Sequence, residues 1–164
     1  MATLANAHQL LDGALSSLTA PLLDAHLSTL ALVVGPTMLL DALDLVDKRS
    51  VARINTPAGA VVYQVAASSS SAAPGGSYTL YLDLPGGGYC PCAFFSSAVF
   101  APGATAVICK HLLAARIADR LGAWHDKHVG LRWVAGFATR FGAGAAGPPA
   151  AATAAGAGSA AGAG

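Results

Sequence analysis

Hydrophobic and polar positions along the chain change their period near residue 50. From residue 4 to residue 34, leucines recur mostly every three or four positions, which is the period of an amphipathic α-helix. The tripeptide Thr19-Ala20-Pro21 predicts a break in this region, and Pro21 suits the first turn of a second helix. The N-terminal part of the chain is therefore expected to be helical.

A further helix is predicted from Pro36 to about Lys48. Proline fits the first helical position because it has no amide hydrogen to leave unpaired. Asp44 and Lys48 are four residues apart, the spacing of an intrahelical ion pair. The apolar face of this helix is expected to contain Leu39, Leu40, Leu43 and Val46.

From residue 50 the pattern becomes typical of β-strands. Residues 50–55 and 60–67 are predicted strands, the second rich in β-branched side chains, and residues 56–59 form the turn between them. A polar loop of Ser, Ala, Pro and Gly follows at 68–76. Residues 77–84 alternate, so they predict a third strand that places on one side Tyr78, Leu80, Leu82 and Leu84.

Two helices are predicted in the last third of the chain. The first runs from Cys109 to about Leu121 and the second from about Trp124 to Phe141. Their expected apolar faces contain Leu112, Leu113, Ile117 and Leu121 in the first, and Val129, Trp133, Phe137 and Phe141 in the second. The remaining segment is almost entirely Ala, Gly and Pro, so it lacks large side chains to bury and is expected to be disordered.

Composition narrows the class of protein. The longest apolar run, residues 27–40, is interrupted by Gly35-Pro36 and is shorter than the roughly 18 residues that span a bilayer. The first ten residues carry no Lys or Arg, so no secretory signal is expected. We therefore expect no membrane association and a reducing, intracellular compartment, where three cysteines would not form a disulfide framework.

Charge is distributed unevenly between the two halves of the chain. Residues 1–108 contain three basic and six acidic side chains, whereas residues 109–164 contain six basic and two acidic ones. The second half could contact an anionic partner, and Arg116 and Arg120 lie one helical turn apart with Lys110 upstream. These charges are sparse for a dedicated nucleic-acid surface, and a solvated helix face explains them as well.

All three cysteines lie in one segment that ends in a histidine, with the pattern C-x-C-x16-C-x-H. Residues two apart point to the same side of an extended chain, so Cys90 and Cys92 can direct both sulfurs to one point. On a regular helix such residues diverge by about 200°, so Cys109 and His111 must lie at a helix start to converge. Three thiolates and an imidazole suit a closed, tetrahedral, structural Zn²⁺ site.

Two alternatives to zinc remain for these residues: inert buried cysteines and a redox pair. Zinc is favoured because the pattern uses every cysteine and ends at a helix start, where Lys110 and free amides would offset the net charge of −1. His125 and His128, three apart on the expected last helix, could share a ligand, although solvent-facing side chains are the simpler interpretation. No acid–base or nucleophilic constellation rises above chance, so no enzymatic activity is expected.

The motif C-x-C followed by C-x-H is the signature of the SWIM zinc finger. The segments ALDLVDKRSV, TPAG-AVVYQV, CPCAF and ICKHLLAARIA resemble the small SWIM-domain proteins of Shu-type recombination complexes over about residues 36–121. The resemblance places the family's metal ligands on Cys90, Cys92, Cys109 and His111. It implies a nuclear, non-catalytic subunit that binds a RecA-like recombinase paralogue and supports recombinase filaments on single-stranded DNA in homologous recombination.

Two other functions remain open. The domain could bind single-stranded DNA directly through Lys110, Arg116 and Arg120, or it could be an adaptor in another complex such as a ubiquitin ligase. The leucine-rich helices favour a protein partner, provided that not all of their leucines belong to the core.

The expected architecture is α+β. It comprises an N-terminal helical region (1–49), a small antiparallel sheet with the SWIM zinc finger (50–121), a C-terminal helix (122–141) and a disordered Ala/Gly-rich tail (142–164).

Overall fold

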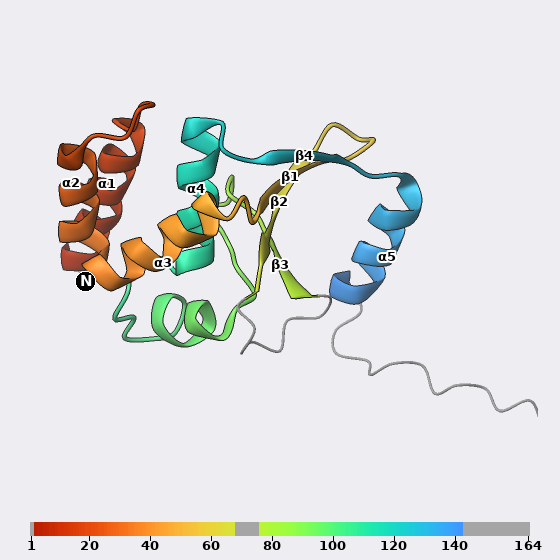
Figure 1. Ribbon diagram of the computed structural model, residues 1–164. Coiled ribbons are helices and arrows are strands. Elements are labelled where there is room, and N and C mark those ends of the chain that lie inside the picture. Colours follow the sequence, from red (N-terminus) through yellow and green to blue (C-terminus); the bar gives the residue numbers. More distant parts are fainter. Residues whose placement is uncertain (1, 68–75, 143–164) are drawn as a thin grey trace, which may run out of the picture.

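The structure, a computed structural model, describes residues 2–67 and 76–142 and has the expected α+β fold (Figure 1). Its elements in chain order are α1 (Ala2–Ser16), α2 (Asp24–Val34), α3 (Pro36–Asp47), β1 (Val51–Asn55), β2 (Val61–Ala66), β3 (Ser77–Leu80), the π-helix η2 (Phe95–Val99), α4 (Lys110–Leu121), β4 (His125–His128) and α5 (Leu131–Gly142). The polar loop predicted at 68–76, apart from Gly76, and the tail predicted at 142–164, apart from Gly142, lie outside the described residues.

The four strands form one sheet in the order β3-β2-β1-β4. The pairs β1–β2 and β2–β3 are antiparallel, with Val51 opposite Val65 and Tyr63 opposite Leu80. Strand β4 instead runs parallel to β1, because α4 carries the chain back across the sheet before β4 begins. The three predicted strands therefore form the expected antiparallel sheet, and β4, which was not predicted, adds a parallel edge that makes the whole sheet mixed.

Strand β4 also corrects the predicted last helix, which begins at Leu131 instead of near residue 124. All four β4 residues are exposed, and no apolar alternation marks them as a strand. Pairing with β1 determines their conformation, and the side-chain amide of Asn55 donates a hydrogen bond of 2.8 Å to Asp126. A short polar edge strand of this kind also resists pairing with other chains.

The third strand is shorter than the alternation predicted. β3 ends at Leu80, and Tyr81 forms a single antiparallel bridge with Tyr89. This bridge closes the turn at 85–88, so the chain leaves the sheet plane and Leu84 becomes exposed instead of joining the apolar side.

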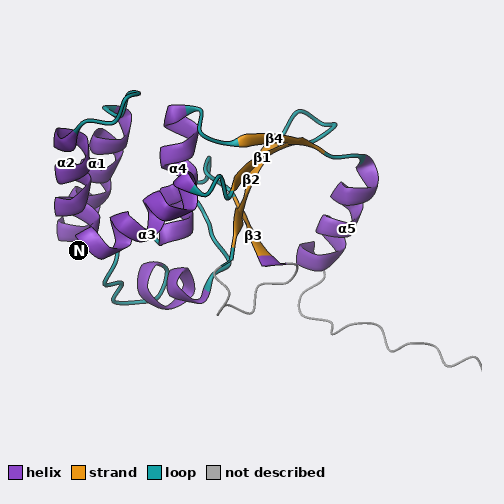
Figure 2. Cartoon of the chain, in the orientation of Figure 1, coloured by secondary structure: helices purple, strands orange, loops and turns teal. Residues whose placement is uncertain are grey.

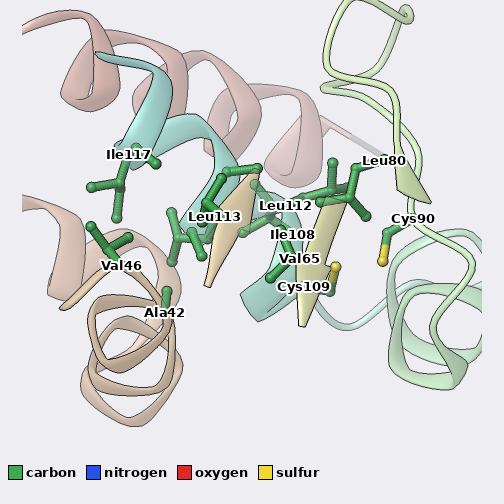
Figure 3. Close-up of a cluster of buried hydrophobic side chains, with 14 of the residues drawn as sticks. Ala42, Val46, Val65, Leu80, Cys90, Ile108, Cys109, Leu112, Leu113 and Ile117 are labelled. Atoms are coloured by element: carbon green, nitrogen blue, oxygen red, sulfur yellow. The ribbon is translucent and has the colours of Figure 1, made fainter. Parts of the chain in front are cut away.

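The core lies between α3, α4 and one face of the sheet, as Figure 3 shows. Helix α4 is buried along most of its length and packs against α3 and β2. The α3 face that meets α4 contains Leu39, Ala42 and Val46, whereas Leu40 is 67% exposed. The prediction that Leu40 belongs to the apolar face is wrong, because Ala42 and not Leu40 lies on the buried side of α3.

The opposite face of the sheet is also covered. Ala52, Ile54 and Val62 alternate with the residues that face α4, yet all three are buried. Figure 2 shows the sheet between α4 on one side and α5 on the other. No helix in the described part of the chain is both long enough and apolar enough to span a bilayer.

The N-terminal helices follow the predicted order with one correction. Pro21 does not open the second helix but lies in the loop before it, and α2 begins at Asp24. The backbone amide of Leu23 donates to Nδ1 of His26 at 3.4 Å, so an imidazole satisfies one donor at this helix start. The predicted ion pair between Asp44 and Lys48 is present at 2.7 Å.

Candidate metal centre

The two halves of the C-x-C…C-x-H motif come from different kinds of backbone. Cys90 and Cys92 follow the bridge at Tyr89, in a segment without helix. Cys109 is the N-cap of α4, with extended dihedral angles of −97° and 160°, and His111 is in the first turn. The positions of Cys109 and His111 agree with the prediction that this pair lies at a helix start.

The structure brings these four side chains together. One potential ligand atom from each of Cys90, Cys92, Cys109 and His111 lies within 4.8 Å of all the others, and Nδ1 of His111 is 3.9 Å from the Cys90 sulfur. The four residues are between 0% and 4% exposed, and none of the cysteines forms a disulfide. Among the residues that the structure describes, no other group of three or more His, Cys, Asp or Glu side chains could hold a metal ion.

The donor set fits Zn²⁺. Bonds of about 2.0–2.3 Å in a tetrahedral site separate the ligand atoms by roughly 3.5–3.8 Å, so the four atoms need to approach by only about 1 Å. The cluster could therefore hold one zinc ion.

Electrostatics gives a second reason for an ion at this place. Hydrogen bonds with Cys109 and Cys92 raise the pKa of the Cys90 thiol, and burial raises it further. Hydrogen bonds from Cys109 and Cys90 instead lower the pKa of Cys92, whose sulfur also accepts the Phe95 amide at 3.3 Å. The neighbouring cysteines thus shift the two pKa values in opposite directions, and a bound cation would favour the thiolate form of all three cysteines.

Opposing interactions also act on the pKa of the third cysteine, Cys109. The Cys90 interaction lowers the pKa of Cys109, but hydrogen bonding to Cys92 and burial outweigh it and raise the pKa to about 12. Cys109 would therefore have to release its proton when it binds a metal.

Aromatic rings surround the cluster. The ring of Tyr78 lies 4.7 Å from that of His111, at an interplanar angle of 53°. Phe95 contacts Tyr89 edge-on at 5.5 Å and stacks on Phe100 at 6.2 Å. The contact with Tyr78 restricts the rotation of the imidazole.

Gly88 sets the path of the chain into Cys90. Its φ is +103°, and a Cβ atom there would lie 2.6 Å from the carbonyl oxygen of Tyr81 and 3.1 Å from Leu112. Only glycine fits both the conformation and the space, so the glycine-rich turn positions the first ligand against α4.

The three basic residues considered for nucleic-acid contact lie on α4 and face other helices. Lys110 forms an ion pair with Asp41 of α3 at 3.3 Å, and Arg116 forms one with Asp12 of α1 at 2.6 Å. Arg120 donates hydrogen bonds to the carbonyl oxygens of Leu15 and Ser16 at the C-terminal end of α1. All three side chains thus connect α4 to the N-terminal helices, and a contact with DNA stays a prediction.

His125 and His128 do not form a shared site. They lie on β4 instead of a helix, and residues three apart on a strand point to opposite faces. Both are exposed, as the simpler interpretation of the sequence expected.

One feature beside the cluster was missed by the sequence analysis. A cavity of about 560 Å³ lies between the α2–α3 junction and the cluster, and its wall includes Pro36, Phe94 and His111. The Gly35-Pro36 dipeptide indicated a boundary between helices, but nothing in the pattern placed that boundary against the cysteines.

A closed cluster of three cysteines and a histidine, divided between a β-bridge and a helix start in the order C-x-C…C-x-H, defines a SWIM-type zinc-finger protein. The chain is 37% identical over 106 residues to zinc finger SWIM domain-containing protein 7 of Danio rerio. The aligned region covers 65% of the chain and 69% of that relative. The chain belongs to this family.

Two further relatives of the chain have the same name. The protein of Mus musculus is 38% identical over 106 residues, or 65% of the chain and 63% of the relative. That of Homo sapiens is 37% identical over 91 residues, or 56% of the chain and 58% of the relative. The match thus spans less than two thirds of these two proteins. No family model matches the chain, and no solved structure matches it.

Proposed function

We propose that this protein is a non-catalytic, zinc-binding subunit of a Shu-type complex in the nucleus. With a RecA-like recombinase paralogue it promotes homologous recombination DNA repair by supporting recombinase filaments on single-stranded DNA. One observation carries the non-catalytic role: the chain offers four buried donors at one point, a complete tetrahedral set with no position for a substrate.

Exposed leucines on the N-terminal helices support an adaptor role. The sheet and α4 bury a continuous core, yet several leucines of α1–α3 and the loop between them remain at the surface: Leu10, Leu23, Leu32 and Leu40. Scattered apolar side chains are common on any protein, but leucines that recur along adjacent helices offer area that a protein partner can cover.

Contact with single-stranded DNA belongs mainly to the partner in this proposal. Lys110 and Arg116 are paired with aspartates, and Arg120 binds backbone carbonyls, so the α4 cations are already engaged. A phosphate would have to compete with these contacts.

Coexpression tests the complex directly. A RecA-like paralogue from the same organism should copurify with the wild-type chain at equal stoichiometry. Leu32→Gln, at a position 88% exposed, should weaken copurification. The matched control is Leu131→Gln on α5, at a position 74% exposed, which should have no effect. Absence of the paralogue from purified wild-type protein would contradict the proposal.

A further inference from the structure

The cavity beside the metal cluster has the size and lining of a binding site. Its volume of about 560 Å³ lies within the range of roughly 300–1,000 Å³ typical of ligand pockets. Val34, Met38 and Tyr78 contribute apolar walls, and Phe94, which is partly exposed, belongs to the same lining. In Figure 1 the green segment that contains η2 lies beside α3, and the residues just before η2, Ala93 and Phe94, belong to the lining together with the start of α3.

Two helices begin at this cavity. Pro36, Thr37 and Met38 of the first turn of α3 line it, and so do Lys110 and His111 of the first turn of α4. The start of α3 has no side-chain hydrogen bond to cap it, whereas at the start of α4 the Cys109 sulfur already takes up the backbone amide of Leu112. Free amide groups at a helix start carry partial positive charge and require acceptors, so an occupant with a carbonyl oxygen would satisfy them.

A buried imidazole nitrogen points to the same need. His111 is 4% exposed, and its ring forms part of the cavity wall. Nδ1 is the ring nitrogen near the Cys90 sulfur, whereas Nε2 has no partner in the described structure. A metal-bound histidine normally donates its second N–H to a carbonyl, a carboxylate or water, so this site lacks an acceptor that an occupant could supply.

Charges around the cavity favour a neutral occupant. Lys110 and Asp41, the two ionised residues of the lining outside the cluster, pair with each other at 3.3 Å. A site of three thiolates with Zn²⁺ has a net charge of −1, and two helix starts contribute about +0.5 each. The sum is close to zero, which disfavours both a free carboxylate and a cation.

From these observations we propose that the cavity binds an uncharged, apolar peptide segment of a partner protein, whose backbone carbonyls accept hydrogen bonds from the starts of α3 and α4. The chain's own residues 143–164 contain no side chain larger than Thr, so they could not fill this volume with apolar groups. This inference rests on the proposed adaptor function, because it assigns one contact of that adaptor with its partner.

Two tryptophan variants test the assignment. Thr37→Trp places a bulky ring at an exposed residue of the lining, and Asp47→Trp places the same ring at the last residue of α3, outside the lining. Both variants should retain one zinc ion per chain and the thermal midpoint of the wild type. Thr37→Trp should reduce copurification of the RecA-like paralogue by about tenfold, whereas Asp47→Trp should not change it.

A second probe does not depend on that paralogue. A phage-displayed library of short random peptides is selected on zinc-loaded, full-length protein and then tested on both variants. The selected peptides should be apolar and uncharged, bind the wild type and Asp47→Trp equally, and lose about tenfold in affinity for Thr37→Trp. This result would support the cavity even if the paralogue does not bind.

The other outcomes separate the two proposals. If the paralogue copurifies equally with Thr37→Trp and the peptides are insensitive to it, the cavity assignment is wrong and the adaptor function stands. If the wild type forms dimers that only Thr37→Trp dissociates, a second copy of the chain is the occupant and the assignment is again wrong. Selection of only charged peptides would overturn it as well.

Discussion

The hydroxyl group of Tyr63 donates a hydrogen bond to the carboxylate of Asp119, so a side chain of β2 holds the C-terminal half of α4 across 56 residues of sequence. Tyr63 is buried. Burial, together with the hydrogen bond to Asp119 and its negative charge, raises the pKa of the tyrosine above its ordinary value of 10.0. This contact fixes α4 over the sheet at the end opposite the cysteines.

Loss of this contact should destabilise the fold in a pH-dependent manner. The pKa of Tyr63 is higher in the folded state than in the unfolded state. The contribution of the Tyr63 hydroxyl to the free energy of unfolding is therefore complete below pH 10.0 and is lost as the pH rises above that value. Tyr63→Phe should lower the free energy of unfolding by about 1–3 kcal/mol at pH 7, since Asp119 loses its donor. Urea unfolding of both proteins from pH 7 to pH 11 measures this, and a difference that stays constant over that range would contradict it.

Removal of zinc should unfold the region that connects the bridge to α4. Structural zinc contributes an apparent 10–16 kcal/mol in finger peptides, about as much as the whole stability of a small domain. Chelation and Cys92→Ser should therefore both abolish the protection of α4 amides in hydrogen exchange and leave no bound metal. Ser97→Ala, at an exposed position in η2, is the control and should retain both. Native protection in metal-free Cys92→Ser would show that the site is not structural.

Substitution of two glycines by alanine should give opposite results. Gly88→Ala forces a Cβ against the Tyr81 carbonyl at a φ of +103°, so it should cost more than about 2 kcal/mol and weaken zinc binding. Gly13→Ala lies within α1 with no atom near the new Cβ, so it should stabilise the protein by about 0.5–1 kcal/mol. Thermal unfolding and competition with a zinc chelator measure both effects. Equal behaviour of the two variants would refute the role of Gly88.

Arg120 should act as a helix cap rather than as a DNA contact. Arg120→Ala removes donors from the Leu15 and Ser16 carbonyls, so it should destabilise the fold by about 1 kcal/mol. Any weak binding of the isolated chain to single-stranded DNA should keep the same salt dependence, because no phosphate contact is lost. A decrease of about 0.7 in the slope of log K against log salt would instead assign one phosphate to Arg120.

Much of the architecture follows from local pattern. The helix from Pro36, the strands near residues 51–55 and 61–66 and the helix after Cys109 match the prediction, because each has a clear period and a proline, a turn or an N-cap at its boundary. The convergence of the four donors also follows from spacing, since an extended C-x-C and a C-x-H at a helix start each direct two side chains one way.

The errors occurred where distant residues decide the outcome. His125–His128 form a strand only because the exposed edge of β1 is available beside them, and no period of their own shows it. Leu40 is exposed because Ala42 meets α4 in its place. The cavity depends on two helix starts from opposite halves of the chain, a relationship that sequence spacing does not encode.

The parallel pairing of β4 with β1 joins the first strand to leave the ribosome with the last. Until residues 125–128 emerge, the outer edge of β1 has unpaired backbone groups that another nascent chain could capture. A stop codon placed shortly after α4 would spare Cys90, Cys92, Cys109 and His111, yet it would leave a truncated product prone to aggregation.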